Sequence, residues 1–141
     1  MSEQVPRSPL DAALERVGDR WSLLVVEALL EGPLRFGELQ ARLPGIAPNI
    51  LSQRLRRLEQ ERVVRASRYS ERPPRLEYAL TADGQELAGV LRLLAGWGAV
   101  RAEGVDLPRH LDCGSPLEAH WFCPTCARAV EPAESSALSY L

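Results

Sequence analysis

The stretch GIAPNILSQRLRRLEQERVVRASRYSERPPRLEYAL, residues Gly45 to Leu80, begins with a helix signal. Pro48 suits the first helical position, because its missing N–H would have no partner there. Three leucines then recur at i, i+4 and i+7 and give the helix one apolar face: Leu51, Leu55 and Leu58. The rest of the surface carries hydrogen-bonding and cationic side chains: Asn49, Ser52, Gln53, Arg56, Arg57 and Gln60. Arg, Gln and Asn can bond bidentately to base edges in a major groove, so this polar face is a candidate DNA-reading surface.

A hairpin signal follows the helix. Two β-like runs, Val63–Tyr69 and Leu76–Leu80, are joined by a predicted loop, Ser70–Arg75. The Pro73-Pro74 pair stops any helix and suits a loop tip. Candidate backbone-contacting residues on this hairpin are Arg68, Arg72 and Arg75. A polar-faced helix followed by an Arg-rich hairpin is the plan of a winged helix-turn-helix, so we predict a mainly α fold with a small β-hairpin wing (α+β).

The charge of this stretch also favours a polyanionic partner. Residues 50–75 contain eight Arg and three Glu, whereas the whole chain of 141 residues has a formal net charge of −2. Such asymmetry is typical of a positive footprint on an otherwise acidic body. The alternative is a solvated helix face laced with acidic residues such as Glu59 and Glu61. The order of helix and hairpin favours contact with double-stranded DNA.

The flanking sequence predicts the helices that would support this unit. We expect helices from Ser8-Pro9 to about Val17, from Arg20 to about Leu30 with Asp19 as cap, over Gly37–Leu43, and from Ala82 to about Glu103, with a short extended piece at Leu34–Phe36. The last helix has more apolar residues than one small core can cover, so we expect a partner subunit on it. No run of 18 apolar residues and no leader pattern is present, and the expected location is the cytoplasm, at the nucleoid, with no membrane partner.

Three motifs resemble the HxlR-type winged-helix transcriptional regulators of bacteria. They are DRWSLLVVEAL at 19–29, RFGELQARLPGIAPNILSQRLRRLE at 35–59 and RPPRLEYALTADG at 72–84, and the resemblance covers roughly Ser8 to Gly98. It implies a homodimer joined through its first and last helices. Because the composition changes past Gly104, we expect the winged-helix domain to cover residues 1–103. The resemblance also implies that the helix Pro48–Gln60 enters the major groove and that the wing Tyr69–Leu76 contacts the backbone or the minor groove. Repression is the commoner mode of regulation in the family.

One position departs from the pattern of the family. Many members have Cys-Pro at the start of the first helix, and some use that cysteine to sense oxidants or electrophiles. Here the corresponding residue is Ser8, in Ser8-Pro9-Leu10. A hydroxyl cannot supply the reactive thiolate that such sensing needs, so we expect that route of sensing to be lost.

The last segment, residues 104–141, has the spacing of a metal site. His110, Cys113, Cys123 and Cys126 read as H-x2-C-x9-C-x2-C, and two such pairs can bind a tetrahedral Zn²⁺. We predict a zinc-ribbon-like tail with a structural zinc ion. His120 is a competing ligand, because His120-x2-Cys123 has the same spacing. The alternatives are three inert buried thiols, a redox pair at Cys123 and Cys126, or a structural disulfide, which would leave one cysteine over.

The sequence shows no catalytic grouping, and we do not expect an enzyme. The leading hypothesis is a sequence-specific DNA-binding transcriptional regulator that acts as a homodimer on a pseudo-palindromic operator. A protein–protein or RNA-handling adaptor is the second hypothesis, although an adaptor would more often have an apolar patch at Asn49, Gln53 and Arg56. The third is a regulator that responds to a small-molecule effector near Trp21, Tyr78 and Trp97, or to oxidation of the tail.

Overall fold

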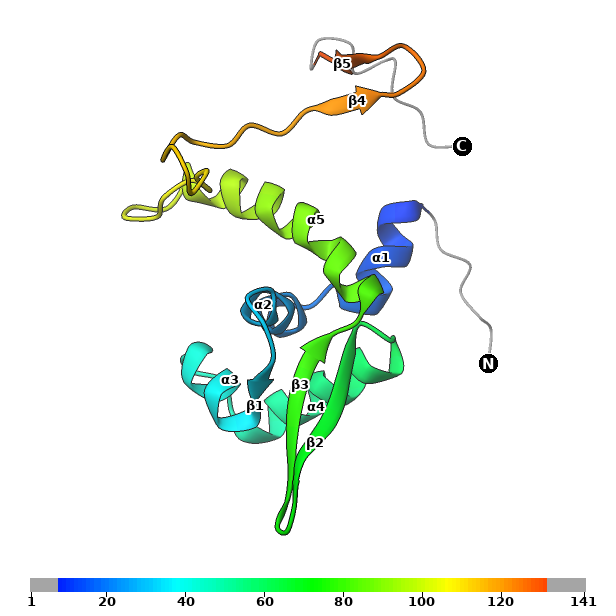
Figure 1. Ribbon diagram of the computed structural model, residues 1–141, viewed down its shortest axis with the longest axis vertical. Coiled ribbons are helices and arrows are strands. Elements are labelled where there is room, and N and C mark those ends of the chain that lie inside the picture. The colour runs from blue at the N-terminus through cyan, green and yellow to red at the C-terminus, as the bar shows by residue number, and fades with distance from the viewer. Residues whose placement is uncertain (1–7, 132–141) are drawn as a thin grey trace. The chain divides into compact units, whose positions relative to one another are not determined.

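The computed structural model describes residues 8–131, in which five helices and five strands follow one another (Figure 1). Their bounds are α1 Pro9–Val17, α2 Arg20–Leu29, β1 Leu34–Arg35, α3 Phe36–Arg42, α4 Pro48–Gln60, β2 Val64–Glu71, β3 Pro74–Leu80, α5 Ala82–Ala99, β4 Trp121–Cys123 and β5 Arg128–Val130. The chain divides into two compact units, residues 1–91 and 92–141. This division falls inside α5, whereas the sequence led us to divide the chain after residue 103. Within the described residues, none of the helices could span a membrane.

Local capping explains where the first two helices begin. The Ser8 hydroxyl oxygen accepts a hydrogen bond from the Asp11 N–H at 3.1 Å, and Pro9 occupies the first turn of α1. The Asp19 carboxylate accepts from the Ser22 N–H at 3.0 Å and from the Ser22 hydroxyl at 2.5 Å at the start of α2. Both caps satisfy N–H groups that a helix leaves without an internal partner. The predicted Asp19 cap is confirmed.

The core of the first unit lies between the apolar faces of the helices and the sheet. Each of the three predicted α4 leucines is at most 1% exposed, which confirms the apolar face of this helix. They belong to one cluster with side chains of α2, α3 and the sheet, including Val25, Val26, Leu29, Leu39, Val64 and Leu80. Burial of one side of α4 fixes which residues remain on its outer side.

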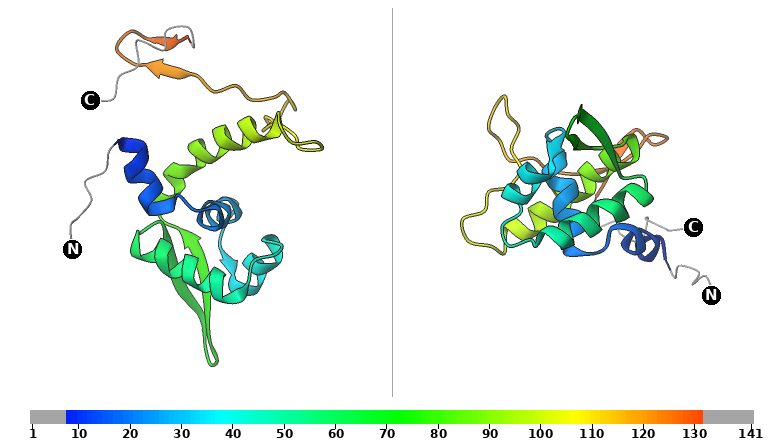
Figure 2. Two further views of the ribbon diagram at one scale, coloured as in Figure 1. Left: turned by 180° about the vertical axis from the view of Figure 1, so that it is seen from behind. Right: turned by 90° about the horizontal axis from the view of Figure 1, so that it is seen from below.

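The sheet has the strand order β1-β3-β2, with both neighbouring pairs antiparallel. The hairpin of β2 and β3 projects past the helices as a wing (Figures 1 and 2). The predicted loop Ser70–Arg75 was too long, because the strands pair as far as Glu71 with Pro74 and leave only Arg72 and Pro73 at the tip. A proline at the first position of a strand is tolerated, since its missing N–H removes no inner ladder bond.

Thr81 connects the start of α5 to the turn between α4 and β2. The Thr81 hydroxyl accepts from the Gly84 N–H at 3.1 Å, and the Thr81 N–H donates to the Val63 carbonyl at 3.0 Å. Gly84 packs so closely on this carbonyl that an added Cβ would lie 2.2 Å from the Val63 oxygen. The first half of α5 joins the core through Leu87 and Leu91.

The predicted extension of α5 to about Glu103 was wrong, because the helix ends at Ala99. Gly96 and Gly98 lie in its last turn, and each glycine weakens a helix by about 1 kcal/mol relative to alanine. The Arg101 N–H then bonds to the Gly98 carbonyl at 2.9 Å and closes a turn.

The second unit contains two short hairpins after α5. In the first, Arg109 pairs with Pro116, and the Leu117 N–H donates to the Pro108 carbonyl at 2.8 Å. In the second, β4 and β5 pair antiparallel from Trp121 with Val130 to Cys123 with Arg128. Each hairpin carries one pair of the predicted metal ligands at or beside its turn.

Candidate nucleic-acid interface

The outer face of α4 is built from side chains opposite its buried leucines. Asn49, Gln53 and Arg56 are exposed, and Ser52 is half-buried beside them. Within the described part of the chain, none of these four side chains forms a hydrogen bond or an ion pair with the protein. Their donors and acceptors are therefore available to an external partner. The apolar patch that an adaptor would more often carry is absent at these described positions.

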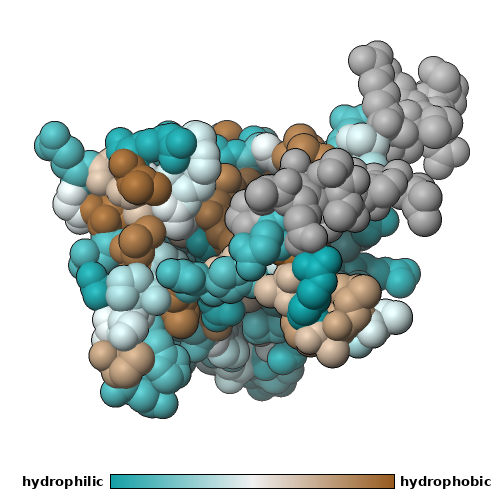
Figure 3. Space-filling view, turned by 90° about the horizontal axis from the view of Figure 1, so that it is seen from above, coloured by the Kyte–Doolittle hydropathy of each residue, from teal (hydrophilic) through white to brown (hydrophobic). Residues whose placement is uncertain are grey.

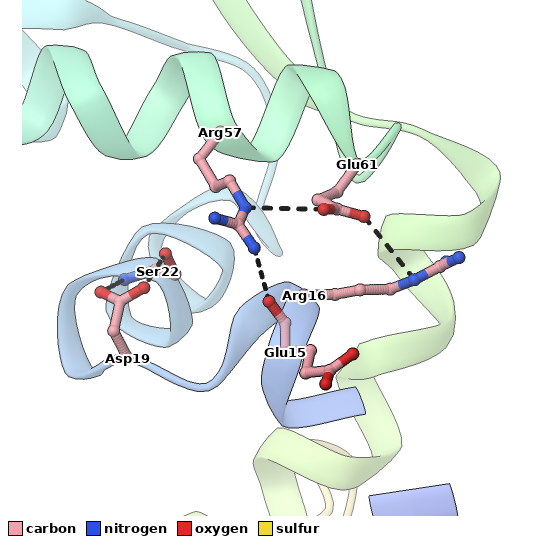
Figure 4. Close-up of polar contacts among 6 residues, drawn as sticks. All are labelled: Glu15, Arg16, Asp19, Ser22, Arg57 and Glu61. Atoms are coloured by element: carbon pink, nitrogen blue, oxygen red, sulfur yellow. Dashed lines mark hydrogen bonds and ion pairs between the residues drawn. The ribbon is translucent and has the colours of Figure 1, made fainter. Parts of the chain in front are cut away.

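Arg57, also predicted to contact DNA, has a different environment (Figure 4). Its Nη2 donates to the main-chain carbonyl of Glu15, at the end of α1, over 2.6 Å. Its Nε lies 3.5 Å from Glu61 Oε1, and Glu61 Oε2 lies 3.6 Å from Arg16 Nε. These contacts tie α4 to the end of α1, so the Arg57 guanidinium is bonded to the body of the protein.

Arg54 makes a second connection from α4 to the junction of α1 and α2. Its Nε lies 2.8 Å from Asp19 Oδ1. This contact is an ion pair rather than a directed hydrogen bond, because the buried Nε has no partner in hydrogen-bonding geometry among the described residues. Desolvation acts to raise the pKa of Asp19, but the bonds from Ser22 and the charge of Arg54 outweigh it and lower the pKa below its usual value of 3.8. Asp19 therefore stays ionised at neutral pH, as both of its roles require.

The wing presents its cations to solvent. Arg72 and Arg75 are exposed and have no hydrogen bond or ion pair in the described structure. Arg68 is also exposed and lies 3.5 Å from Glu71, a surface pair that is worth little energy and can be exchanged readily. All three predicted wing residues are thus positioned where a phosphate backbone could reach them.

The sequence analysis missed one further cation beside the wing, Arg35. Its guanidinium carbon lies 4.1 Å from the centre of the Tyr69 ring, in a cation–π contact. Arg35 is on β1 and Tyr69 is on β2, with β3 between them, and the register of β2 shifts between Arg68 and Ser70. No local pattern could indicate this contact, because it depends on pairing between strands that are distant in sequence.

The three aromatic residues considered for an effector site have separate surroundings. Trp21 lines an open cavity of about 450 Å³, with its other walls formed by Arg20, Leu24, Glu27, Ala28, Glu31, Arg42, Leu43 and Pro44. Tyr78 is 9% exposed and belongs to the core, where desolvation, with a smaller effect of Glu59, raises its pKa. Trp97 belongs to the second unit and stacks under Arg101, whose guanidinium carbon lies 4.0 Å from the ring centre.

The predicted metal ligands come together in two pairs. His110 Nδ1 lies 3.3 Å from Cys113 Sγ, and Cys123 and Cys126 interact with each other on the second hairpin. Among residues 8–131, no three His, Cys, Asp or Glu side chains are grouped as a metal site. Bonds from the Ser115 side chain and N–H, and from His110, lower the pKa of the Cys113 thiol to about 7. The Cys126 N–H and thiol lower the pKa of Cys123, and Cys123 in turn raises that of Cys126.

A helix with a free polar face, held on a small core and followed by a basic hairpin, defines the class of winged helix-turn-helix proteins. The family model described as "HxlR-like helix-turn-helix" matches residues 16–105, so the chain belongs to this family. The sequence-based resemblance is thereby confirmed for the winged-helix part.

Similar curated proteins are named as transcriptional regulators. The HTH-type transcriptional regulator YvaP of Bacillus subtilis is 40% identical over 111 residues, which cover 79% of this chain and 97% of that protein. An HTH-type transcriptional regulator of Mycobacterium tuberculosis is 35% identical over 134 residues, covering 92% of this chain and 84% of that protein. The predicted class, transcriptional regulator, is confirmed. A match over 92% of the chain must extend beyond residue 105, so the similarity includes part of the tail.

Solved structures of similar fold include two regulators. The redox regulator HypR in its oxidized form has a TM-score of 0.64 and 28% identity, and the match covers 67% of this chain and 98% of that one. The reduced form of the transcriptional regulator YodB from B. subtilis has a TM-score of 0.58 and 32% identity, and the match covers 69% of this chain and 95% of that one. Both matches support the winged helix-turn-helix fold of the first unit.

Proposed function

We propose that this transcriptional regulator binds a pseudo-palindromic operator as a homodimer, with α4 of each subunit in a major groove. The observation that carries the proposal is the outer face of α4, where Asn49, Gln53 and Arg56 are exposed and unengaged. These side chains match the donor and acceptor patterns of base edges. Ser52 flanks this face. Because the target is chromosomal DNA, we place the action of the protein in the cytoplasm, at the nucleoid.

In this proposal the wing holds the protein on the DNA and adds little sequence discrimination. Arg68, Arg72 and Arg75 would contact phosphates or the minor groove next to the site read by α4. Phosphate contacts fix register and orientation but carry no direct sequence information. Arg57 would hold α4 against the end of α1 through the Glu15 carbonyl. A contact between Arg57 and a phosphate would have to compete with this carbonyl and with Glu61.

Exposed apolar helices support the homodimer. On α1, Leu10 is 66% exposed. On α5 four apolar side chains are each more than half exposed, Val90, Leu93, Leu94 and Trp97, and Val100 directly after the helix is also exposed. Apolar side chains are visible at the surface among polar ones in Figure 3. A soluble monomer rarely leaves so many large apolar residues in contact with water. A second copy of the chain is the occupant that the resemblance implies, and a two-fold dimer would read two inverted half-sites.

Immunoprecipitation of the protein from its host, followed by sequencing of the bound DNA, tests the proposal. We expect the recovered fragments to share an inverted repeat with half-sites roughly 10 bp apart, or one helical turn. Purified protein should shift a duplex with this repeat and bind a scrambled duplex far more weakly. Recovery of RNA or of protein partners without a shared DNA motif would contradict the proposal and favour the adaptor. Deletion of the gene tests repression, because transcripts next to the bound sites should then increase.

A ligand-responsive version of this function is favoured by the cavity beside Trp21. The cavity lies against α2 and the end of α3 and has both apolar and charged walls, with Arg42 Nη1 and Glu31 Oε2 paired at 2.9 Å. A small molecule bound there would contact the helix that precedes α4. Quenching of Trp21 fluorescence by a metabolite, lost in Trp21→Phe and accompanied by weaker DNA binding, would identify such an effector.

We also propose that residues 104–141 form a Cys/His module of the zinc-ribbon type, appended to the DNA-binding part. The two hairpins of the described tail support this proposal, since zinc ribbons present their ligands on the turns of such hairpins. We expect the outer face of α4 to form without this module, because the core that supports α4 consists of residues before position 92.

A further inference from the structure

The two hairpins of the tail have the same layout around their candidate ligands. In the first, the Gly114 N–H donates to the His110 carbonyl at 2.7 Å, which closes a tight turn around Cys113. In the second, the turn between β4 and β5 holds Cys123 and Cys126. We call these turns, His110–Gly114 and Cys123–Ala127, the first and second knuckle. In each knuckle two residues separate the two ligands.

The backbone after the second ligand is left-handed in both knuckles. Gly114, which follows Cys113, has φ +70°, and Ala127, which follows Cys126, has φ +53°. Glycine adopts this conformation freely, but for alanine it costs roughly 1–2 kcal/mol. Such a residue persists where the surrounding structure requires its conformation. The second knuckle therefore has the same left-handed residue after its second ligand as the first knuckle, although that residue is alanine and not glycine.

The histidine in the first knuckle is the better fourth ligand. His110 Nδ1 lies 3.3 Å from Cys113 Sγ, so these two candidate ligand atoms are already next to each other. His120 Nε2 instead lies 3.4 Å from Glu118 Oε2, outside both knuckles. The geometry separates two ligands that sequence spacing alone could not distinguish.

Little apolar burial supports the tail. Leu111 is 98% exposed, Trp121 is 66% exposed and Phe122 is 62% exposed. A segment this small, with its large apolar side chains in water, needs another source of folding free energy, and a structural metal is a common one.

We propose that the tail binds one Zn²⁺ per chain through His110, Cys113, Cys123 and Cys126. Among the described residues the two pairs do not form one group of ligands, and residues 117–120 link the two hairpins along the chain. Binding would draw the two pairs together into one tetrahedral set, with three thiols releasing their protons to water as they become thiolates. A Cys3His set has no open position, so the zinc would be structural.

Elemental analysis of the full chain, purified without added metal and without a metal-affinity column, tests the proposal. We expect about one zinc per chain. A zinc content near zero, with three thiols that titrate freely in the native protein, would overturn it. A content near one half would show a zinc shared between subunits and would overturn the one-per-chain assignment. A native mass that shows a Cys123–Cys126 disulfide would replace the zinc site with a redox pair.

Matched variants test the ligand assignment. Cys126→Ser and His110→Ala should each lose most of the bound zinc to a weak chelator, whereas His120→Ala should retain it like the wild type. Co²⁺ in place of Zn²⁺ should give the visible spectrum of a tetrahedral thiolate site, weakened in Cys126→Ser. The opposite behaviour of the two histidine variants would overturn the choice of His110. Operator binding by Cys126→Ser should equal that of the wild type, so a failure here is distinct from a failure of the DNA-binding proposal.

Discussion

Arg56 and Arg57 are adjacent on α4 but have different environments, and the first prediction follows from this. Arg56→Ala or Gln53→Ala should lower operator affinity by about 1–3 kcal/mol and relax base preference at one position per half-site. The reason is that both side chains are exposed and unengaged in the described structure. Fluorescence anisotropy with a set of single-base operator variants measures both effects. Unchanged base preference in both variants would contradict the assignment of α4 as the reading helix.

Gly84 predicts a large effect from one methyl group. In Gly84→Ala the new Cβ would lie 2.2 Å from the Val63 carbonyl oxygen, a backbone atom that cannot move aside easily. We expect a loss of about 1–3 kcal/mol in the free energy of unfolding, as for other overpacked sites. Gly89→Ala on the same helix is the control, because nothing lies within 4 Å of its added Cβ. That variant should gain about 0.5–1 kcal/mol from helix propensity. Equal effects of the two substitutions would show that the Gly84 contact is unimportant.

Asp19 makes stability depend on pH in a defined direction. Its pKa is lower in the folded chain than the usual value of 3.8, so its ionised form favours the folded state. This contribution is complete above about pH 4–5 and is lost as the pH falls through the folded pKa. Asp19→Ala should cost about 0.5–2 kcal/mol at neutral pH through loss of the cap. Urea unfolding of both proteins should show this difference shrink toward zero in strong acid, and a constant difference would contradict the prediction.

At the scale of the element, we expect the positive charge of the wing to strengthen binding to any DNA sequence. Arg72→Ala or Arg75→Ala should weaken binding to operator and to unrelated DNA by similar factors. Loss of one phosphate contact should also reduce the slope of log affinity against log salt by about 1. Titrations at several salt concentrations measure this slope. If Arg56→Ala and Arg72→Ala changed the base preference and the salt slope alike, the division of labour between α4 and the wing would be wrong.

Prediction from the sequence worked best where the pattern is local. The bounds of α4 and its buried leucines followed from periodicity, and the Asp19 cap followed from one residue type before a helix. The extent of the wing did not follow from a local pattern, because the pairing between β2 and β3 decides where the hairpin turns. The environment of Arg57 was also hidden, since its acceptor is a backbone atom 42 residues earlier. In the tail, spacing indicated the pairs of candidate ligands, but nothing in the sequence indicated that Ala127 takes a left-handed conformation.

At the scale of the whole molecule, we expect assembly to depend on the apolar surface of α5. Leu94 is 51% exposed, and Leu94→Glu would place a carboxylate in the proposed seam between subunits. An unpaired buried charge is strongly unfavourable, so the variant should be monomeric or aggregated and should not bind the operator. Gln85→Glu adds the same charge at an exposed polar position of α5 and should remain dimeric. Light scattering at tens of micromolar decides the matter, and a monomeric wild type would contradict the homodimer.

The bond from Arg57 to the Glu15 carbonyl has a consequence for how this sequence can vary. The acceptor is a main-chain oxygen, which every amino acid provides. Position 15 can therefore drift through evolution without disturbing the connection, whereas position 57 must keep a long side chain with donors to preserve it. An alignment of related chains should show arginine kept at position 57 and a variable position 15. Covariation could connect Arg57 with its side-chain partner Glu61, but not with position 15. The hydrogen bond that joins the first helix to α4, the proposed reading helix, would thus be invisible to any method that compares side chains alone.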